Sequence, residues 1–241
     1  MSLRAPPPLG RPLALEPVSD GQLALRDGDT LIAHAVFGEL QLQPPAPVAL
    51  EEAQAAVAGY LGFKHHAFPT CFACGPQREE GDGLRLFPGP VAGRGVVACP
   101  WRPDPGLADE RGFVQPEFVW AALDCPTAFA CELRESWAIV LARLTARIDQ
   151  PLRAEQPHIV FAWSVGRDGR KHHAACAISN EDGDVLAVSR ALWIEPKDRH
   201  AFGAAAYVLT SPSDRRAMGR RSQTDKELGR QSLATAVPAR R

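Results

Sequence analysis

One amphipathic segment followed by a series of strand-like runs constrains the fold of this chain more than any other feature. From about Gln115 to Leu133, apolar side chains recur on one face at helical spacing, which predicts one long core helix. Four strand-like runs follow: Ala138–Ile148, His158–Val165, Lys171–Ser179 and Val185–Ile194. Asp-Gly pairs at 168–169 and 182–183 provide tight turns between the last three runs. The runs therefore predict an antiparallel meander that follows the helix.

The segment before the helix completes the predicted domain. Two further strands are expected at Leu84–Phe87 and Gly95–Trp101, after a Gly-rich turn. Two strands, a buried helix and a four-stranded meander predict an α+β domain over residues 68–196, in which an antiparallel sheet wraps round a central helix. This order is typical of the hotdog fold, although the pattern alone also fits other α+β sheets. Residues 46–67 are predicted to be a linker with one short helix, Leu50–Ala58.

The first 45 residues resemble part of the later meander, because they contain short strand-like runs joined by Asp-Gly turns. Two motifs recur in the later meander. Arg4 followed by Pro8-Leu9 corresponds to Arg147 followed by Pro151-Leu152, and Asp27–Leu31 corresponds to Asp182–Leu186. The repeat predicts a degenerate double hotdog with a partial first unit over residues 1–45. The opening strand and helix of that unit are then expected upstream of Met1. Chance similarity between two Asp-Gly hairpins is the alternative interpretation.

The charge distribution separates a body from a basic C-terminal segment. The whole chain has a net charge of −1, but residues 197–241 hold ten Lys and Arg against four Asp and Glu. The polar composition of that segment predicts a disordered basic tail. The body has no broad basic footprint, so we expect no nucleic-acid partner. Polyanion binding through the tail is an alternative that depends on charge alone.

The chain has none of the usual sequence signals for a membrane or secretory location. Its N-terminus lacks the apolar run of a secretory signal, and no stretch approaches the roughly 20 apolar residues of a membrane span. We therefore expect a cytoplasmic protein without a membrane partner. Its six cysteines are then expected to be reduced thiols rather than a disulfide framework.

Three strings in the second half carry a family resemblance. They are Phe68-Pro-Thr-Cys-Phe-Ala-Cys-Gly-Pro76, Gly81-Asp-Gly-Leu-Arg-Leu-Phe87 and Val114-Gln-Pro-Glu-Phe-Val-Trp-Ala-Ala-Leu-Asp-Cys125. Together they resemble the hotdog thioesterase superfamily, most closely actinobacterial-type thioesterase-like proteins and more distantly the phenylacetate-pathway acyl-CoA thioesterases. The resemblance covers about half of the chain.

The resemblance implies an acyl-thioester site on the central helix. In enzymes of the superfamily the helix opens with His-Gly-Gly or a relative, and the first Gly N–H polarises the thioester carbonyl. A carboxylate eight positions after that Gly, usually facing it from another subunit, acts as general base or nucleophile. Asp124 occupies the carboxylate position. A buried structural Asp, bonded to backbone or Arg, is the alternative reading of the same residue.

The helix start departs from the family pattern. Gln115, Pro116 and Glu117 occupy the positions of His, Gly and Gly, and a proline has no N–H to donate. The Gln115 side chain or the Glu117 amide could replace the missing donor, while the Glu117 carboxylate could simply stabilise the helix start. Thr127 lies one turn after Asp124 and could orient water or bond its own backbone. A ligand-binding protein without turnover is therefore a serious alternative to an enzyme.

Three further features are candidates for ligand contacts. The Cys71-x-x-Cys74 motif is interpreted as a packed turn rather than a metal site, because zinc normally takes four ligands and no second such pair exists. Arg170 and Lys171 could contact the phosphates of coenzyme A, or could be an ordinary solvated strand start. Trp120 could line an acyl pocket, or could pack in the core.

The sequence therefore predicts a thioesterase-like hotdog protein that hydrolyses an acyl thioester, with acyl-CoA as the expected substrate. Asp124 is the predicted base or nucleophile, and no cofactor or metal is expected. A non-catalytic protein that binds acyl-CoA or another acyl ligand is the alternative. Because hotdog units pair sheet to sheet, we expect a homodimer.

Overall fold

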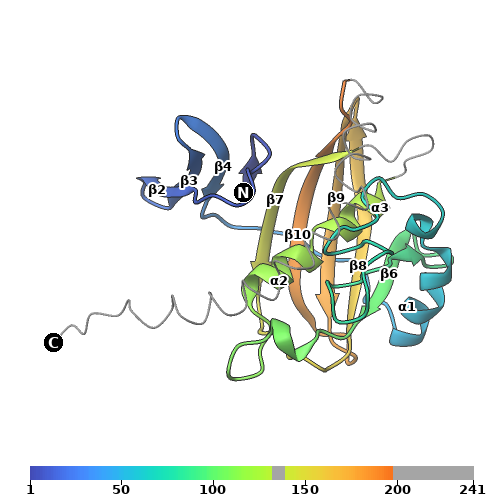
Figure 1. Ribbon diagram of the computed structural model, residues 1–241. Helices are drawn as coiled ribbons and strands as arrows, with labels where there is room; N and C mark the ends of the chain where they lie inside the picture. The colour runs from blue at the N-terminus through green and yellow to red at the C-terminus, as the bar shows by residue number, and fades with distance from the viewer. Residues whose placement is uncertain (132–138, 198–241) are drawn as a thin grey trace.

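The computed structural model describes residues 1–131 and 139–197, which form one antiparallel sheet with helices on both of its faces. The sheet has ten strands in the order β2-β3-β4-β1-β7-β10-β9-β8-β6-β5. Figure 1 shows two parts, a large curved sheet around the helices and a small sheet formed by the N-terminal strands. The two parts are joined along the sheet by β1 and β7.

The large part contains the predicted meander. Its strands are β5 (Gly89–Pro90), β6 (Val96–Trp101), β7 (Val140–Ile148), β8 (His158–Asp168), β9 (Lys171–Ser179) and β10 (Val185–Ile194). The turns between β8, β9 and β10 use Gly169 and Gly183, whose φ angles of 54° and 87° lie in the left-handed region that glycine adopts readily. The antiparallel meander predicted from the Asp-Gly pairs is thus confirmed.

The central helix is divided into two, which corrects the prediction of a single helix from Gln115 to Leu133. Helix α2 spans Pro116–Ala122 and helix α3 spans Cys125–Ala130. The break follows from Pro126, which has no N–H to donate to the carbonyl four residues earlier. Next to it the Thr127 N–H donates to the Asp124 carbonyl at 3.0 Å, and the Leu123 carbonyl accepts a hydrogen bond of 2.9 Å from the Ser189 hydroxyl of β10.

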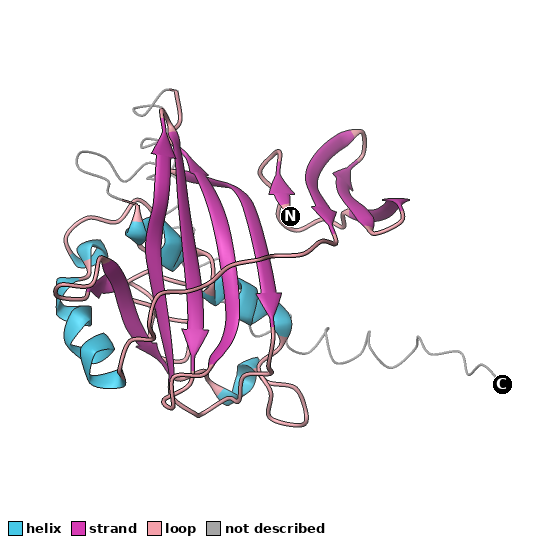
Figure 2. Cartoon of the chain, turned by 180° about the vertical axis from the view of Figure 1, so that it is seen from behind, coloured by secondary structure: helices cyan, strands magenta, loops and turns pink. Residues whose placement is uncertain are grey.

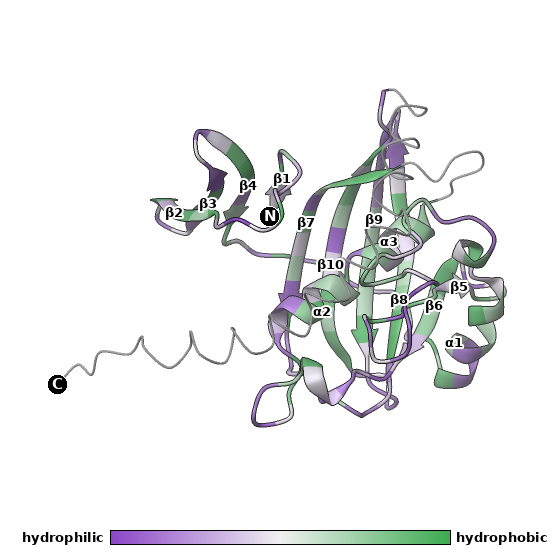
Figure 3. Ribbon diagram, viewed as in Figure 1, coloured by the Kyte–Doolittle hydropathy of each residue, from purple (hydrophilic) through white to green (hydrophobic). Residues whose placement is uncertain are grey.

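The two helices lie against the concave face of the large sheet. Helix α3 contacts β6, β8, β9 and β10, and the strands behind it in Figure 3 are largely hydrophobic. The core between helices and sheet includes Val119, Ala122, Leu123, Val160, Ala162, Cys176 and Ile178. An antiparallel sheet wrapped round a central helical segment is the predicted hotdog arrangement, and the α+β fold class is confirmed.

The opposite face of the large sheet is covered by a second layer. Helix α1 (Leu50–Ala56) packs on β6 and β8 and is followed by the short 3₁₀ turns η1 (Val57–Gly59) and η2 (Leu61–Phe63). A third 3₁₀ turn, η3 (Pro105–Leu107), precedes α2. The extended segment after β4 crosses the back of the sheet (Figure 2), and its Leu40 and Val48 are buried there. The predicted linker thus contributes to the core.

The N-terminal strands repeat the order of the later meander. They are β1 (Ser2–Leu3), β2 (Ala14–Ser19), β3 (Gln22–Asp27) and β4 (Thr30–Val36). Their order, β2-β3-β4-β1, is that of β8-β9-β10-β7, so the edges β1 and β7 meet in the middle of the sheet. Met1 and Leu144 exchange backbone hydrogen bonds at this junction. The repeated order is the one that a degenerate double hotdog requires.

The strand predicted at Leu84–Phe87 does not form, and this prediction is wrong. Arg85 has a φ angle of 52°, which interrupts the extended backbone. The N–H groups of Leu84 and Leu86 instead donate to the carbonyls of Phe72 and Ala73, at 2.8 Å each. This segment therefore holds the Cys71–Cys74 loop in place.

The boundaries of the predicted domains stay predictions, and the predicted basic tail lies outside the described residues from residue 198 onward. Among the described residues, no helix is both long enough and apolar enough to span a membrane.

Candidate functional site

Asp124 lies at the break between α2 and α3, on the side of the helices that faces the interior. Its Oδ1 atom is buried and accepts no hydrogen bond from any described residue, and no ion pair is formed there. Burial, and secondarily the negative charge of Cys71, raises the pKa of Asp124 to about 7. Among the described residues, Asp124 Oδ1 thus has neither the backbone partner nor the Arg partner that the structural alternative from the sequence requires.

A hydrogen-bond network fixes the backbone around Asp124. The Thr127 hydroxyl, which is fully buried, donates to the Asp124 carbonyl at 2.6 Å. The same hydroxyl accepts a hydrogen bond of 2.7 Å from Trp193 Nε1 on β10. Thr127 was predicted to orient water or to bond its own backbone, and the geometry corresponds to the second of these roles. It positions the helix junction.

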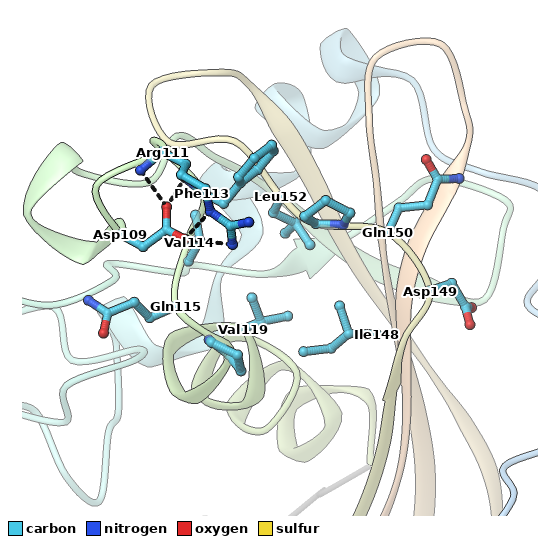
Figure 4. A pocket seen from close by; sticks show the side chains of 12 residues that line it. Asp109, Arg111, Phe113, Val114, Gln115, Val119, Ile148, Asp149, Gln150 and Leu152 are labelled. Atoms are coloured by element: carbon cyan, nitrogen blue, oxygen red, sulfur yellow. Dashed lines mark hydrogen bonds and ion pairs between the residues drawn. The ribbon is translucent and has the colours of Figure 1, made fainter. Parts of the chain in front are cut away.

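The start of α2 lines an open cavity of about 340 Å³ (Figure 4). Its lining includes Gln115 and Pro116 at the start of α2, and Ile148, Pro151 and Leu152 at and after the end of β7. The Gln115 side-chain amide is 3.5 Å from the Ala108 carbonyl, so it is only weakly held. Glu117 is exposed in the first turn, where its N–H has no acceptor within the helix. This end of the helix can therefore offer polar groups to a ligand.

The structure does not bring the two ends of the predicted site together within one chain. Pro116 and Asp124 are at opposite ends of the α2 segment, about 12 Å apart at the usual rise per residue. Asp124 is also not among the residues that line the 340 Å³ cavity. A site that uses both the helix start and Asp124 would need a second helix of the same kind.

Three cysteine sulfurs meet beside Asp124. The Sγ atoms of Cys71, Cys74 and Cys125 all lie within 4.8 Å of one another, and those of Cys71 and Cys125 are 3.6 Å apart. Hydrogen bonds from the Cys125 and Cys74 thiols lower the pKa of the Cys71 thiol far below its usual range. Sequence reasoning considered only the first two cysteines, because Cys125 is 54 positions away from Cys71 and no spacing motif connects them.

A small apolar cavity of about 80 Å³ adjoins the cysteine sulfurs. Its walls include His66, Phe129, Ile139 and Trp193 in addition to the three cysteines. Tyr60 closes the cluster from another side, since its hydroxyl donates to the Cys74 carbonyl at 2.8 Å and its ring packs on His66 and Phe129. The cluster is thus enclosed by aromatic groups.

The predicted ligand-contact residues lie elsewhere. Arg170 and Lys171 are at the β8–β9 hairpin, where the Arg170 guanidinium donates to the Glu195 carbonyl at 2.6 Å and Lys171 is 3.9 Å from Asp168. Trp120 is half-buried against the hydrophobic cluster of β7, β9 and β10. None of the three lines the 340 Å³ or the 80 Å³ cavity.

Comparisons with solved structures return matches at low sequence identity. A thioesterase superfamily protein matches at 20% identity over 49% of this chain and 62% of its own, with a TM-score of 0.43. A putative thioesterase of Ralstonia eutropha, described as related to phenylacetic acid degradation, matches at 19% identity over 46% of this chain and 85% of its own, with a TM-score of 0.42. The PaaI protein of the Escherichia coli phenylacetic acid degradation operon matches at 15% identity over 42% of this chain and 76% of its own, with a TM-score of 0.38.

These neighbours come from the group that the sequence motifs resemble. This chain spans less than two thirds of the length of the first of them. No protein-family model and no curated protein matches the sequence. The likeness concerns the fold, and no activity follows from it.

Proposed function

We propose that this protein binds an acyl thioester, with acyl-CoA as the expected substrate, and hydrolyses it with Asp124 as general base or nucleophile. The observation that carries the proposal is the buried Asp124 Oδ1 at the break between two helices, which has no hydrogen-bond partner among the described residues. A buried polar atom without a partner is costly and is therefore more common where a ligand or water completes it. The sequence resemblance assigns the same residue to the reacting carboxylate.

The cavity at the start of α2 is the proposed place for the thioester, and because Asp124 of the same chain does not line it, the proposed reacting carboxylate is Asp124 of a second copy. Its volume of about 340 Å³ is at the small end of the range for ligand pockets. In the absence of an N–H on Pro116, the proposed carbonyl donors are the Glu117 N–H and the Gln115 amide. We keep two further roles as proposals, Trp120 as an acyl contact and Arg170 with Lys171 as phosphate contacts. None of these residues lines this cavity, so each would have to contact a part of the ligand that extends beyond it.

The test is turnover of acyl-CoAs of different chain lengths by the full chain, with released coenzyme A separated by chromatography. This readout avoids thiol reagents, which would react with the protein's own cysteines. Asp124→Ala should lower the rate by about 10²–10⁴-fold, the usual contribution of a general base. Asp182→Ala, a change of the same kind in an exposed hairpin, is the control and should retain the rate. Equal rates for wild type and Asp124→Ala would refute the proposal.

A second candidate function is acyl-ligand binding without hydrolysis. It is favoured by one observation, the proline at the position where the family has an N–H donor for the thioester oxygen. Loss of one such donor costs about 10²–10³-fold in rate. Calorimetric titration with a thioether analogue of acyl-CoA separates the candidates. Saturable binding by a protein that releases no coenzyme A supports the binding function.

We also propose that the protein is a cytoplasmic homodimer. The edge of β7 is paired with β1 at Arg143, so a second copy cannot pair with that part of the edge. The row Leu3, Ala33, Leu25 and Leu15 crosses the N-terminal strands on the face that α2 and α3 cover in the large part. Leu15 is 64% exposed, and this row is the surface proposed for the second copy. The proposed cytoplasmic location is supported by the six free cysteines, because the cytoplasm is a reducing compartment.

A further inference from the structure

The three sulfurs beside α3 have the spacing of a metal-ligand set. In a tetrahedral zinc site with Zn–S bonds of about 2.3 Å, neighbouring sulfurs are about 3.8 Å apart. The Sγ atoms of Cys71 and Cys125 are 3.6 Å apart, and all three sulfurs fall within 4.8 Å. A cation placed among them would therefore require only small movements of the side chains.

The loop that carries two of the cysteines is shaped for this arrangement. The turn closes through a hydrogen bond of 2.9 Å from the Gly75 N–H to the Cys71 carbonyl. A Cβ at Gly75 would lie 2.5 Å from the Cys71 nitrogen, so only glycine fits here. Two cysteines separated by two residues, followed by a required glycine, form a compact loop for one ion.

His66 supports the cluster from outside. Its Nδ1 accepts a hydrogen bond of 3.0 Å from the Phe68 N–H, so in the neutral ring Nε2 carries the proton. Nε2 lies 3.3 Å from the Cys74 sulfur and therefore donates to it. A ring nitrogen that donates cannot bind a metal at the same time. His66 is thus a hydrogen-bond partner of a thiolate rather than a fourth ligand.

The remaining coordination position would face the small cavity. This cavity of about 80 Å³ has room for a few water molecules, each of which occupies about 30 Å³ in the liquid. Three protein ligands with a fourth position for water or a small ligand is a known arrangement for zinc. A disulfide is the other chemistry open to the cluster. The two sulfurs of a disulfide are only about 2.05 Å apart, whereas those of Cys71 and Cys125 are 3.6 Å apart.

We propose that Cys71, Cys74 and Cys125 bind one zinc-class divalent cation through their thiolates, with the fourth position open to the adjoining cavity. Such a cation would link the Cys71–Cys74 loop to the first residue of α3, next to Asp124. Soft thiolate ligands favour Zn²⁺ over Mg²⁺ or Ca²⁺. The site does not depend on the proposed hydrolysis, because its ligands and its test are separate from those of Asp124.

The test is a Co²⁺ titration of the full chain after reduction and removal of bound metal with a chelator. We expect one equivalent of Co²⁺ to bind, with sulfur-to-cobalt charge-transfer absorption in the near ultraviolet that Zn²⁺ displaces. Cys125→Ala should abolish this absorption. The control, Cys99→Ala, changes a buried cysteine on β6 outside the cluster and should retain it. Circular dichroism spectra show whether each variant is folded.

His66→Phe separates ligands from supporting groups. It preserves the aromatic packing but removes the donor to Cys74, so we expect the affinity for Zn²⁺ to fall by about 10–100-fold, as for other partners of metal ligands. The charge-transfer absorption should persist at saturating Co²⁺. The proposal is overturned if the reduced wild type binds no Co²⁺ with this absorption, or if folded Cys125→Ala binds it as tightly as the wild type.

Discussion

Thr127→Val should destabilise the protein far more than its small chemical change implies. Thr127 is fully buried, and its hydroxyl both donates to the Asp124 carbonyl at 2.6 Å and accepts from Trp193 Nε1 at 2.7 Å. Valine has almost the same shape but neither donates nor accepts. The change therefore removes two hydrogen bonds without creating a cavity.

The expected magnitude follows from the two partners that remain. The Trp193 N–H would be left buried without an acceptor, which costs about 1–3 kcal/mol, and the lost bond to the Asp124 carbonyl contributes about 0.5–1.5 kcal/mol. We expect the free energy of unfolding to fall by about 2–4 kcal/mol, out of a typical total of about 5–15 kcal/mol. In the double variant Thr127→Val/Trp193→Phe the unpaired donor is absent. Its destabilisation should be smaller than the sum of the single changes by about 1–2 kcal/mol.

Urea unfolding followed by far-ultraviolet circular dichroism measures these energies, with chelator present so that all variants share one metal state. Thr145→Val on β7 is the matched control. Its hydroxyl is half-buried and bonds to no described residue, so its effect should stay within about 0.5 kcal/mol. A loss below about 0.5 kcal/mol for Thr127→Val, or strict additivity in the double variant, would show that the network does not hold the helix junction.

Three further predictions follow from other parts of the structure. Pro116→Gly restores an N–H at the start of α2, so it should raise the turnover of acyl-CoA by up to about 10²–10³-fold, and an unchanged rate would argue against a missing donor. His158 is buried, its Nδ1 has no partner in the part of the chain that the structure describes, and burial lowers its pKa. The unfolded chain therefore takes up a proton first as the pH falls below about 6.5, so the free energy of unfolding should decrease in acid, and less steeply in His158→Gln. Parallel pH profiles for wild type and variant would contradict this account. Leu15→Glu places a charge on the exposed apolar row of the N-terminal strands and should convert a dimer to a monomer in light-scattering measurements, whereas Val165→Glu on β8 should not. A dimer that withstands Leu15→Glu must use another surface.

The strands were the most predictable part of the fold. The bounds of β9 and β10 coincide with the predicted runs Lys171–Ser179 and Val185–Ile194, because alternating apolar residues and Asp-Gly turns act locally. The repeat of the Asp-Gly motif also predicted the N-terminal strands. Prediction was weaker where the backbone departs from regular geometry. Arg85 breaks the expected strand at Leu84–Phe87, and the helix is divided just after Leu123.

The candidate site was only partly accessible from the sequence. Asp124 was identified because its position matches a family motif and because a carboxylate in a buried helix needs a partner or a role. The burial of Oδ1 without a partner could not be derived in advance. The same is true of Thr127, whose two hydrogen bonds depend on how α3 packs against Trp193.

The sequence by itself determined the order of elements, the hairpins of the meander and the identity of the candidate carboxylate, since each of these depends on neighbours along the chain. Only the tertiary structure decided that Cys125 joins Cys71 and Cys74 and that β1 pairs with β7. These features depend on how the sheet curves around the helices. That curvature brings together residues that no local spacing relates.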